Sequence, residues 1–228
     1  MKNKKYERRL VLAVLGTLFA GGGTICHNAY ADVQKNPVMV TEPGQTVTGD
    51  FNVENCTAPA VVDITASAAK TIDDVTKVDT KSITATFSNK GEANGIRVSP
   101  DYPGTVKVAE GIHITVDSDG NDYDTSGIYL DGVNRSSDPK GSKDESVNAN
   151  AEYKKNGHIS GTHVEVGNGT SITLNAGLKE NENRNRVFAV GLENHFGHMK
   201  VGNDVTLSVA TGKFNNKNTA YGFYQVLC

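Results

Sequence analysis

Several residue types and patterns are scarce or absent in this chain of 228 residues. It has no tryptophan and only 37% hydrophobic residues, too few for the thick core of an ordinary globular domain. Its 23 basic and 26 acidic side chains nearly balance, with a formal net charge of −3, whereas nucleic-acid binding requires a surplus of Lys and Arg on one face. We therefore expect a protein with a thin core that does not bind nucleic acid.

Cysteine is also scarce, since the chain has only Cys26, Cys56 and Cys228. None of them belongs to a C-x-x-C pair or to the spacing of a zinc site. Cys26 lies in an N-terminal segment that we expect to be removed, and the other two lie near opposite ends of the remaining chain. Because an elongated fold keeps its ends apart, we predict no disulfide.

Long apolar runs are missing except near the N-terminus. Residues 10–20 (LVLAVLGTLFA) follow a cluster of Lys and Arg within residues 2–9. Because a membrane-spanning helix needs about 20 apolar residues, this shorter run is typical of a signal peptide. Ala29-Tyr30-Ala31 has the small-x-small pattern of a signal peptidase site. We predict a signal peptide at residues 1–31, cleavage after Ala31, and export.

The sequence does contain an internal repeat, which is typical of solenoid proteins. Three segments align without gaps: VKVAEGIHITV from Val106, VEVGNGTSITL from Val164 and MKVGNDVTLSV from Met199. A third short element follows each of them: GIYLDG from Gly127, AVGLEN from Ala189 and AYGFYQ from Ala220, with an earlier copy, GIRVS, from Gly95. Alternating apolar residues between turns of Gly, Asn and Asp indicate short β-strands, three in each repeat.

Equivalent residues of the repeats predict ladders of side chains on stacked strands. We expect the inward ladders to be Ile83, Ile114, Ile172, Leu207 and, on another face, Ile96, Ile128, Val190, Tyr221. The outward ladders are expected to be Thr84, Thr115, Thr173, Ser208 and, on the next face, Lys107, Glu165, Lys200. The pattern therefore predicts an all-β solenoid whose coils stack into parallel sheets. An antiparallel β-sandwich remains the alternative, because spacing alone does not exclude it.

The repeat also suggests how the chain is divided. Both inward series widen at the same place, where the polar segment 136–160 lies, so we expect a loop inserted into a single coil. Exposed loops on a rigid scaffold are frequent sites of partner contacts, which makes this segment the expected binding loop. We place an N-terminal cap with the first irregular strands at residues 32–80 and the β-helix coils at residues 81–228.

A signal peptide followed by coils reading V-x-V-G-N-x-x-x-I-T-L resembles the passenger region of bacterial autotransporters, which are type V secreted proteins with pectin-lyase-like β-helix repeats. The resemblance covers the signal peptide and roughly residues 82–226. It implies a right-handed parallel β-helix, export through the periplasm, and display at the outer membrane of a Gram-negative-type cell. Such proteins end in a membrane β-barrel, and this chain ends at Val226-Leu227-Cys228 without the long alternating strands of a barrel. We therefore expect an N-terminal fragment of a longer protein, either as such or through a truncated reading frame.

Catalytic chemistry has one pair of candidate residues. Many parallel β-helices are polysaccharide lyases or hydrolases, and glycoside hydrolysis needs two carboxylates converging on one bond. Asp131 and Glu193 each follow a predicted strand in neighbouring coils. Acidic residues that end a strand are more often turn formers, so we predict no catalytic residues and keep the enzyme as the alternative.

Metal binding has two candidate segments. Residues 117–124 (DSDGNDYD) carry four aspartates, but Asp122 occupies the place of the Gly required in a helix-flanked calcium loop, and Ile128 that of the terminal Glu. His195 and His198 lack a third ligand nearby. We therefore predict no metal site and no cofactor, with calcium binding at residues 117–124 left open.

We expect a surface-displayed β-helical protein that acts in adhesion or host interaction without catalysis. Its expected partners are host or matrix surface molecules, either protein or glycan, and the chain is expected to be a monomer. The alternatives are a carbohydrate-active β-helix enzyme and a structural stalk that presents a domain missing from this chain.

Overall fold

In the computed structural model, every regular element of the described residues is a β-strand. The structure describes residues 33–65, 73–88, 91–99, 104–118, 125–131, 162–177, 187–195, 197–212 and 218–226. The sixteen strands are β1 (Val38–Val40), β2 (Thr46–Thr48), β3 (Phe51–Cys56), β4 (Ala60–Ile64), β5 (Val75–Asp79), β6 (Ser82–Phe87), β7 (Ala93–Val98), β8 (Thr105–Val108), β9 (His113–Ser118), β10 (Thr125–Asp131), β11 (His163–Val166), β12 (Ser171–Ala176), β13 (Phe188–His195), β14 (His198–Val201), β15 (Thr206–Thr211) and β16 (Thr219–Val226). Within these described ranges, no helix is long and apolar enough to span a membrane.

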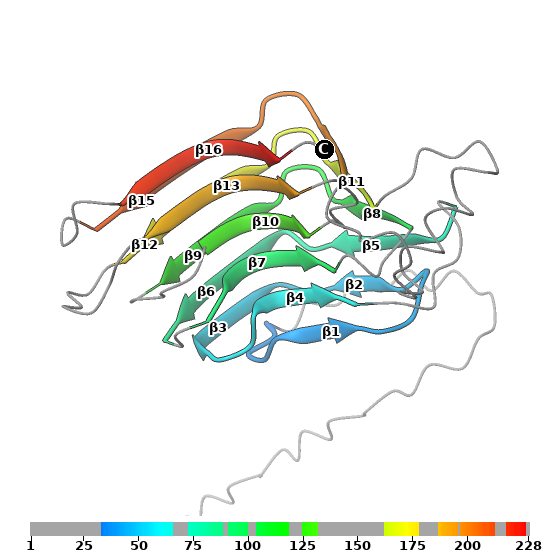
Figure 1. The fold of residues 1–228 in the computed structure, drawn as a ribbon. Coiled ribbons are helices and arrows are strands. Elements are labelled where there is room, and N and C mark those ends of the chain that lie inside the picture. Colours follow the sequence, from blue (N-terminus) through cyan, green and yellow to red (C-terminus); the bar gives the residue numbers. More distant parts are fainter. Residues whose placement is uncertain are drawn as a thin grey trace, which may run out of the picture. The chain divides into compact units, whose positions relative to one another are not determined.

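The strands form three sheets in which every named pair is parallel. Sheet A has the order β15-β12-β9-β6-β3, sheet B the order β1-β4-β7-β10-β13-β16, and sheet C the order β14-β11-β8-β5-β2. Along the chain, one strand of sheet B is followed by one of sheet C and one of sheet A, five times over, and β16 then returns to sheet B. Figure 1 shows the resulting stack of coils. The fold is a parallel β-helix, as the repeat predicts, and the antiparallel sandwich is excluded.

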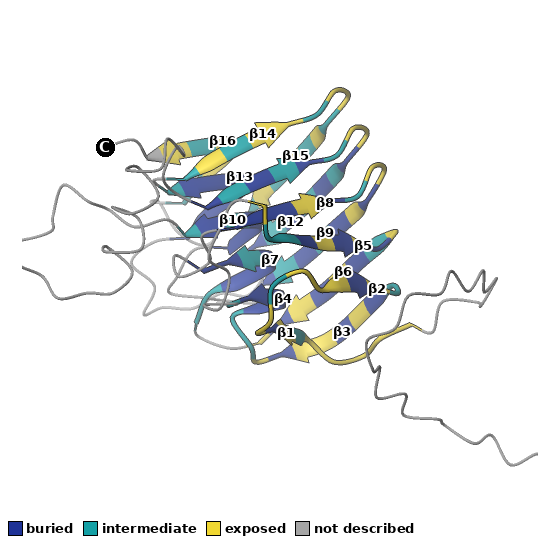
Figure 2. Ribbon diagram, turned by 90° about the vertical axis from the view of Figure 1, so that its right-hand side faces the viewer, coloured by how far each residue is buried: buried dark blue, intermediate teal, exposed yellow. Residues whose placement is uncertain are grey.

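The core lies in the space enclosed by the three sheets. Burial alternates along the strands of sheet A, as in β6, where Ile83, Ala85 and Phe87 are buried and the residues between them are not, whereas β4 and most of β13 are buried throughout. Figure 2 shows this alternation as bands of buried and exposed residues along the stacked strands. Because each coil contributes only a few inward side chains, a thin core suffices, and burying each Ile or Leu contributes roughly 1.5–3 kcal/mol.

Most of the predicted ladders are confirmed. Ile83, Ile114, Ile172 and Leu207 face one another in register on sheet A, as do Thr84, Thr115, Thr173 and Ser208 on its other side. Lys107, Glu165 and Lys200 are in register on sheet C. Ile83, Ile114 and Ile172 are buried members of the core cluster, and Leu207 packs against it.

The predicted ladder through Ile128 and Val190 is wrong by two residues. Ile128 pairs with Leu192, which pairs with Phe223, whereas Val190 pairs with Ser126 and with Tyr221. The cause lies at Gly95, Gly127 and Gly191 of sheet B, where a side chain would not fit. A Cβ on Gly95 would lie 2.6 Å from Ile114 Cγ2, and one on Gly191 would lie 2.6 Å from the Gly222 carbonyl oxygen. The coils therefore align on these glycines rather than on the small residue Ala189.

The corner between sheets C and A needs a left-handed backbone. Gly111 and Gly169 have φ values of 66° at this corner, and Asp204 has 56°. Neighbouring coils are joined here by backbone bonds, since the Gly111 N–H donates to Asn168 O and the Gly169 N–H donates to Asn203 O. The asparagine side chain adds to this, because the Asn203 N–H donates to Asn168 Oδ1 at 2.8 Å. Glycine, Asn and Asp recur at this turn because they tolerate its geometry.

Two further sequence expectations concern the insertion and the cysteines. Segment 136–160 lies outside the described residues, but the strands on either side of it, β10 and β11, keep their register with the coils before and after. Cys56 is a free, buried thiol at the end of β3, and its burial raises its pKa. Cys228 lies outside the described residues.

Candidate functional site

Charged and aromatic side chains gather on the outer face of sheet B. The central row runs in register through Asp63, Arg97, Tyr129, Glu193 and Tyr224. In β7, β10, β13 and β16, this row lies two residues after the single glycine of the strand, so the same backbone position presents each side chain outward. Together with the flanking Glu92, Ser126, Asp131 and His195, these residues make up what we call the sheet-B cluster.

Arg97 lies at the centre of three carboxylates. Its Nη1 is 3.4 Å from Asp63 Oδ1, its Nε is 3.2 Å from Glu92 Oε2, and its Nη2 is 3.2 Å from Asp131 Oδ2. The guanidinium presents several donors in a fixed plane, and this suits it to joining carboxylates from three coils. Arg97 therefore links β4, β7 and β10 across the outer face of the sheet.

The surroundings of Arg97 also change the acidity of its partners. Burial raises the pKa of Asp63, although the Arg97 charge opposes the change. Burial also raises the pKa of Glu92, again against Arg97, and the negative charges of Asp131, Glu193 and Asp63 add to the effect. The single positive charge of Arg97 thus offsets only part of the negative charge of the four nearby carboxylates, which belong to Asp63, Glu92, Asp131 and Glu193.

Glu193 is the most buried acid of the cluster, with a side chain 1% exposed. Its Oε1 is 2.8 Å from His195 Nε2, and its Oε2 accepts a hydrogen bond from Ser126 Oγ. A serine nucleophile needs an imidazole within reach of its hydroxyl. Here the carboxylate lies between Ser126 and His195, so the three residues do not form a Ser-His-acid triad.

Aromatic rings extend the cluster toward β16. Tyr129 lies edge-on to His195, with ring centroids 5.2 Å apart, and its hydroxyl is 3.5 Å from His195 Nδ1. Burial, followed by the charges of Asp131, Glu193 and Glu92, raises the pKa of Tyr129, so its phenol stays protonated at neutral pH. Phe188, Tyr221 and Tyr224 form the adjoining group of rings, with centroids 5.2–5.4 Å apart.

The predicted carboxylate pair lies on this face, but the structure does not align the two residues. Asp131 is opposite His195, and Glu193 is opposite Tyr129, one diagonal step away. Asp131 is bound to Arg97, and Glu193 is bound to Ser126 and His195. Each carboxylate is therefore held by neighbours of its own.

The two candidate metal segments are only partly described. His195 lies on sheet B beside Glu193, whereas His198 lies on sheet C and stacks on His163, with ring centroids 4.7 Å apart. Asp117 lies in β9 and accepts a hydrogen bond from Asn175 Nδ2 at 2.8 Å, while residues 119–124 lie outside the described ranges. Among the described residues, no group of three or more His, Cys, Asp or Glu side chains is placed to hold a metal ion.

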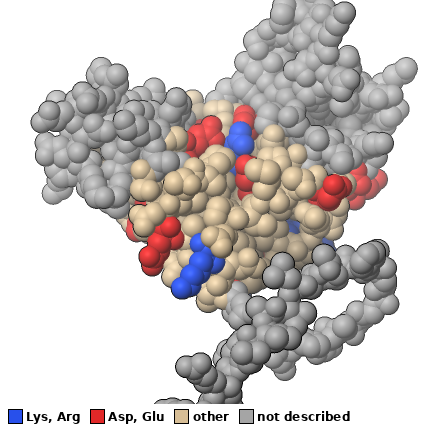
Figure 3. All heavy atoms as spheres, turned by 90° about the horizontal axis from the view of Figure 1, so that it is seen from below, with Lys and Arg blue, Asp and Glu red and all other residues tan. Residues whose placement is uncertain are grey.

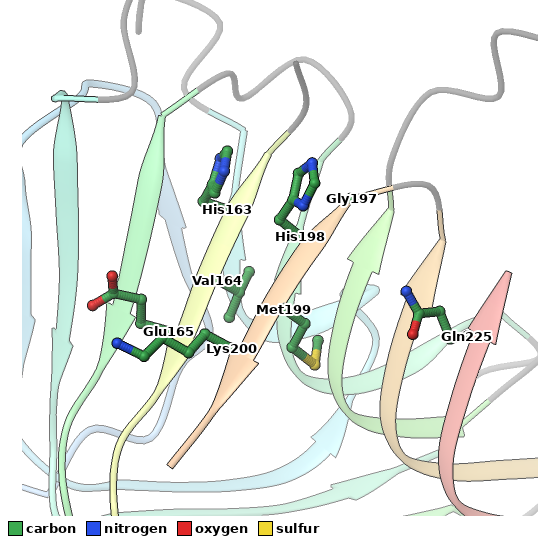
Figure 4. A pocket seen from close by; sticks show the side chains of 8 residues that line it. All are labelled: His163, Val164, Glu165, Gly197, His198, Met199, Lys200 and Gln225. Atoms are coloured by element: carbon green, nitrogen blue, oxygen red, sulfur yellow. The ribbon is translucent and has the colours of Figure 1, made fainter. Parts of the chain in front are cut away.

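A second candidate site is a hollow of about 310 Å³ beside the C-terminal strands. It is lined by His163, Val164, Glu165, Gly197, His198, Met199, Lys200 and Gln225. Figure 4 shows the two imidazoles side by side on β11 and β14, with Glu165 and Lys200 further along the same strands. Gln225 reaches the hollow from β16 of sheet B. The lining is mainly polar and contains both donors and acceptors.

Comparison with known proteins adds no family to this geometry, because no protein-family model, curated protein or solved structure matches the chain. The sites therefore have to be interpreted from their own residues.

Sequence reasoning did not identify Arg97, Tyr129 or Ser126 as members of a site. The signal was present in the third element of each repeat, as GIR, GIY, GLE and GFY. Aligned on glycine, these segments place Arg97, Tyr129, Glu193 and Tyr224 at one position. When the segments are aligned on the small residue Ala189 instead, these four residues no longer share a position. His163 was also missed, because nothing in its own segment indicates that it stacks on His198.

Proposed function

We propose that the chain is an exported, surface-displayed β-helical passenger protein that works in adhesion or host interaction and not in catalysis. Its N-terminal segment has the pattern of a signal peptide, and its coils form a parallel β-helix. Such a solenoid presents long, regular outer faces, which suit extended contact with a partner. The finer assignment, to an autotransporter passenger region, relies on the repeat motif together with this fold.

The proposal that the protein does not catalyse a reaction depends mainly on the burial and contacts of Glu193. A general acid or nucleophile must reach a substrate, yet this side chain is 1% exposed and both of its oxygens are engaged. Asp63 and Asp131 are likewise tied to Arg97. The cluster accordingly acts as a brace that joins neighbouring coils on their outer face.

The proposal is tested by adhesion. Beads coated with the purified protein are expected to bind cultured animal cells or immobilised matrix proteins such as collagen, fibronectin or laminin. Beads coated with the Ile172→Asp variant are the control, because that change places a charge in the core and removes the folded surface. The proposal is wrong if the folded protein binds no more cells or matrix protein than this control does.

A carbohydrate-active enzyme is the second candidate, and one observation favours it. Four carboxylates, an imidazole and a phenol lie on one sheet face, and burial and neighbouring charges raise the pKa of Glu92 and Tyr129, as they do in many acid–base sites. Release of reducing ends from a panel of polysaccharides tests this candidate.

A further inference from the structure

Three lysines form a row on the outer face of sheet C, whose strands also carry the outward carboxylates of Glu165 and Asp79. Lys77, Lys107, Glu165 and Lys200 lie in register across four adjacent strands, β5, β8, β11 and β14. The row thus holds three ammonium groups and one carboxylate in a chain whose formal net charge is −3. At the β1 end of the described coils, by contrast, basic side chains lie among acidic ones and wide uncharged areas (Figure 3).

Only one lysine of this row is neutralised. Lys107 Nζ is 3.4 Å from Glu165 Oε2, and both side chains are nearly half exposed. Among the described residues, no ion pair involves Lys77 or Lys200, and both side chains are exposed. The sole carboxylate of the row is thus occupied by Lys107, and two ammonium groups remain available to an anionic ligand.

The hollow described above lies at the β14 end of this row. Lys200 is one of its lining residues, and the imidazoles of His163 and His198 stack with an interplanar angle of 14°. Imidazole N–H groups are hydrogen-bond donors suited to carboxylate or sulfate oxygens. The volume of about 310 Å³ is at the lower end for small-molecule sites.

We propose that this row and hollow together bind an acidic glycan, an extended polysaccharide that carries carboxylate or sulfate groups. The hollow takes one sugar unit beside the stacked imidazoles of His163 and His198, and Lys200 pairs with its anionic group. Lys77 and Lys107 then meet later anionic groups of the same chain. Strands about 4.8 Å apart set the spacing of these lysines along the axis of the solenoid. A glycan bearing one charge every one or two sugars can follow such a narrow row.

The same geometry disfavours nucleic acid. A duplex needs a broad basic surface to neutralise two dense lines of phosphates. Sheet C offers a single row interrupted by Glu165. Duplex DNA and anionic membrane vesicles are therefore included in the test as competing ligands. The proposal deepens the proposed function, because it names the chemistry of the partner at one defined face.

The test measures binding of the purified protein to immobilised polygalacturonate, which carries carboxylates, and heparin, which carries sulfates. Neutral dextran, duplex DNA and phosphatidylserine vesicles are the comparison ligands. We expect binding to at least one acidic glycan, weakening with added salt, and no binding to dextran. The two glycans distinguish a carboxylate from a sulfate as the preferred group.

Charge variants locate the site. Lys200→Glu is expected to weaken glycan binding about tenfold, because it replaces an attractive contact by a repulsive one in the hollow. Lys35→Glu is the matched control, since it makes the same change in net charge at an exposed residue before β1 and should alter affinity less than about twofold. Glu165→Gln removes the only carboxylate of the row and should strengthen binding about threefold. Circular dichroism verifies that each variant keeps its β-structure.

Four results overturn the proposal. They are an absence of binding to both acidic glycans, equal binding to dextran, tighter binding to DNA or to the vesicles, and equal weakening by Lys200→Glu and Lys35→Glu. If the beads of the adhesion test bind cells while no acidic glycan binds, this inference fails and the proposed function stands. If the beads bind no cells and the protein binds no acidic glycan, the proposed function fails as well.

Discussion

At the scale of single residues, the direction in which a side chain points decides its role. Ile172 and Thr173 are neighbours in β12, yet Ile172 is 1% exposed in the core and Thr173 faces outward between Thr115 and Ser208. Both are β-branched and suit a strand. Their difference therefore arises from the period-2 pattern of the strand and not from local propensity.

Ile172→Asp is expected to be among the most destabilising substitutions, lowering the free energy of unfolding by several kcal/mol or preventing folding, because it buries a charge. Thr173→Asp should cost less than about 1 kcal/mol, since its side chain reaches water. Denaturant unfolding of the two variants measures this difference. Equal destabilisation would contradict the register of sheet A.

The glycines of sheet B give a second test at this scale. A Cβ on Gly95 would lie 2.6 Å from Ile114 Cγ2 and 2.7 Å from the Gly127 carbonyl oxygen, whereas one on Gly222 meets nothing closer than 3.6 Å. Gly95→Ala should therefore lower the free energy of unfolding by about 1–3 kcal/mol, through overpacking. Gly222→Ala occupies the equivalent position in β16 and should be nearly neutral. A Gly95→Ala variant as stable as Gly222→Ala would contradict the close packing around Gly95.

At the scale of strands and their clusters, the repeat pattern predicted more of the fold than of the site. The ladders of sheets A and C follow from alternation alone, because Ile83, Ile114 and Ile172 stand at matching places in obvious copies. The sheet-B ladder does not, because the sequence offers both Ala189 and Gly191 as the match for Gly127, and only the close packing around the glycines selects Gly191. The contacts of Arg97 depend on three coils at once, and no single segment of the sequence displays them.

The sheet-B cluster predicts an unusual dependence of stability on pH. The pKa of Glu92 is raised in the folded protein above its ordinary value of 4.5. The folded state therefore binds the Glu92 proton more tightly than the unfolded state does. The protonated Glu92 adds its full contribution to the free energy of unfolding below pH 4.5, and this contribution is lost as the pH rises through the raised pKa of the folded protein. Lowering the pH from 7.5 toward 5 should therefore raise the free energy of unfolding through this group.

Glu92→Gln is the control for that effect, because it removes the titrating group and keeps the shape of the side chain. The gain in stability between pH 7.5 and pH 5, measured by denaturant unfolding, should be smaller in the variant than in the original protein. An identical gain in both proteins would show that Glu92 does not titrate as described.

At the scale of the whole molecule, we expect the chain to be exported and to fold into a solenoid that is braced on one face. A reporter fused after Ala31 should leave the cytoplasm of a bacterial host, and Leu12→Asp together with Leu15→Asp should retain it, because charges disrupt the apolar run of the signal peptide. Fractionation of cells measures the outcome. Retention of the unmodified fusion in the cytoplasm would contradict export.

The central claim is that the acidic face of sheet B braces the coils and does not catalyse a reaction. Glu193→Gln tests it most directly, because the change replaces the buried carboxylate between Ser126 and His195 by an amide of the same shape. We measure reducing ends released from polysaccharides by the original protein and by the variant, together with the free energy of unfolding of each. We expect no release by either protein and a loss of about 2 kcal/mol of stability in the variant. Release by the original protein that disappears in an equally stable variant would contradict the claim.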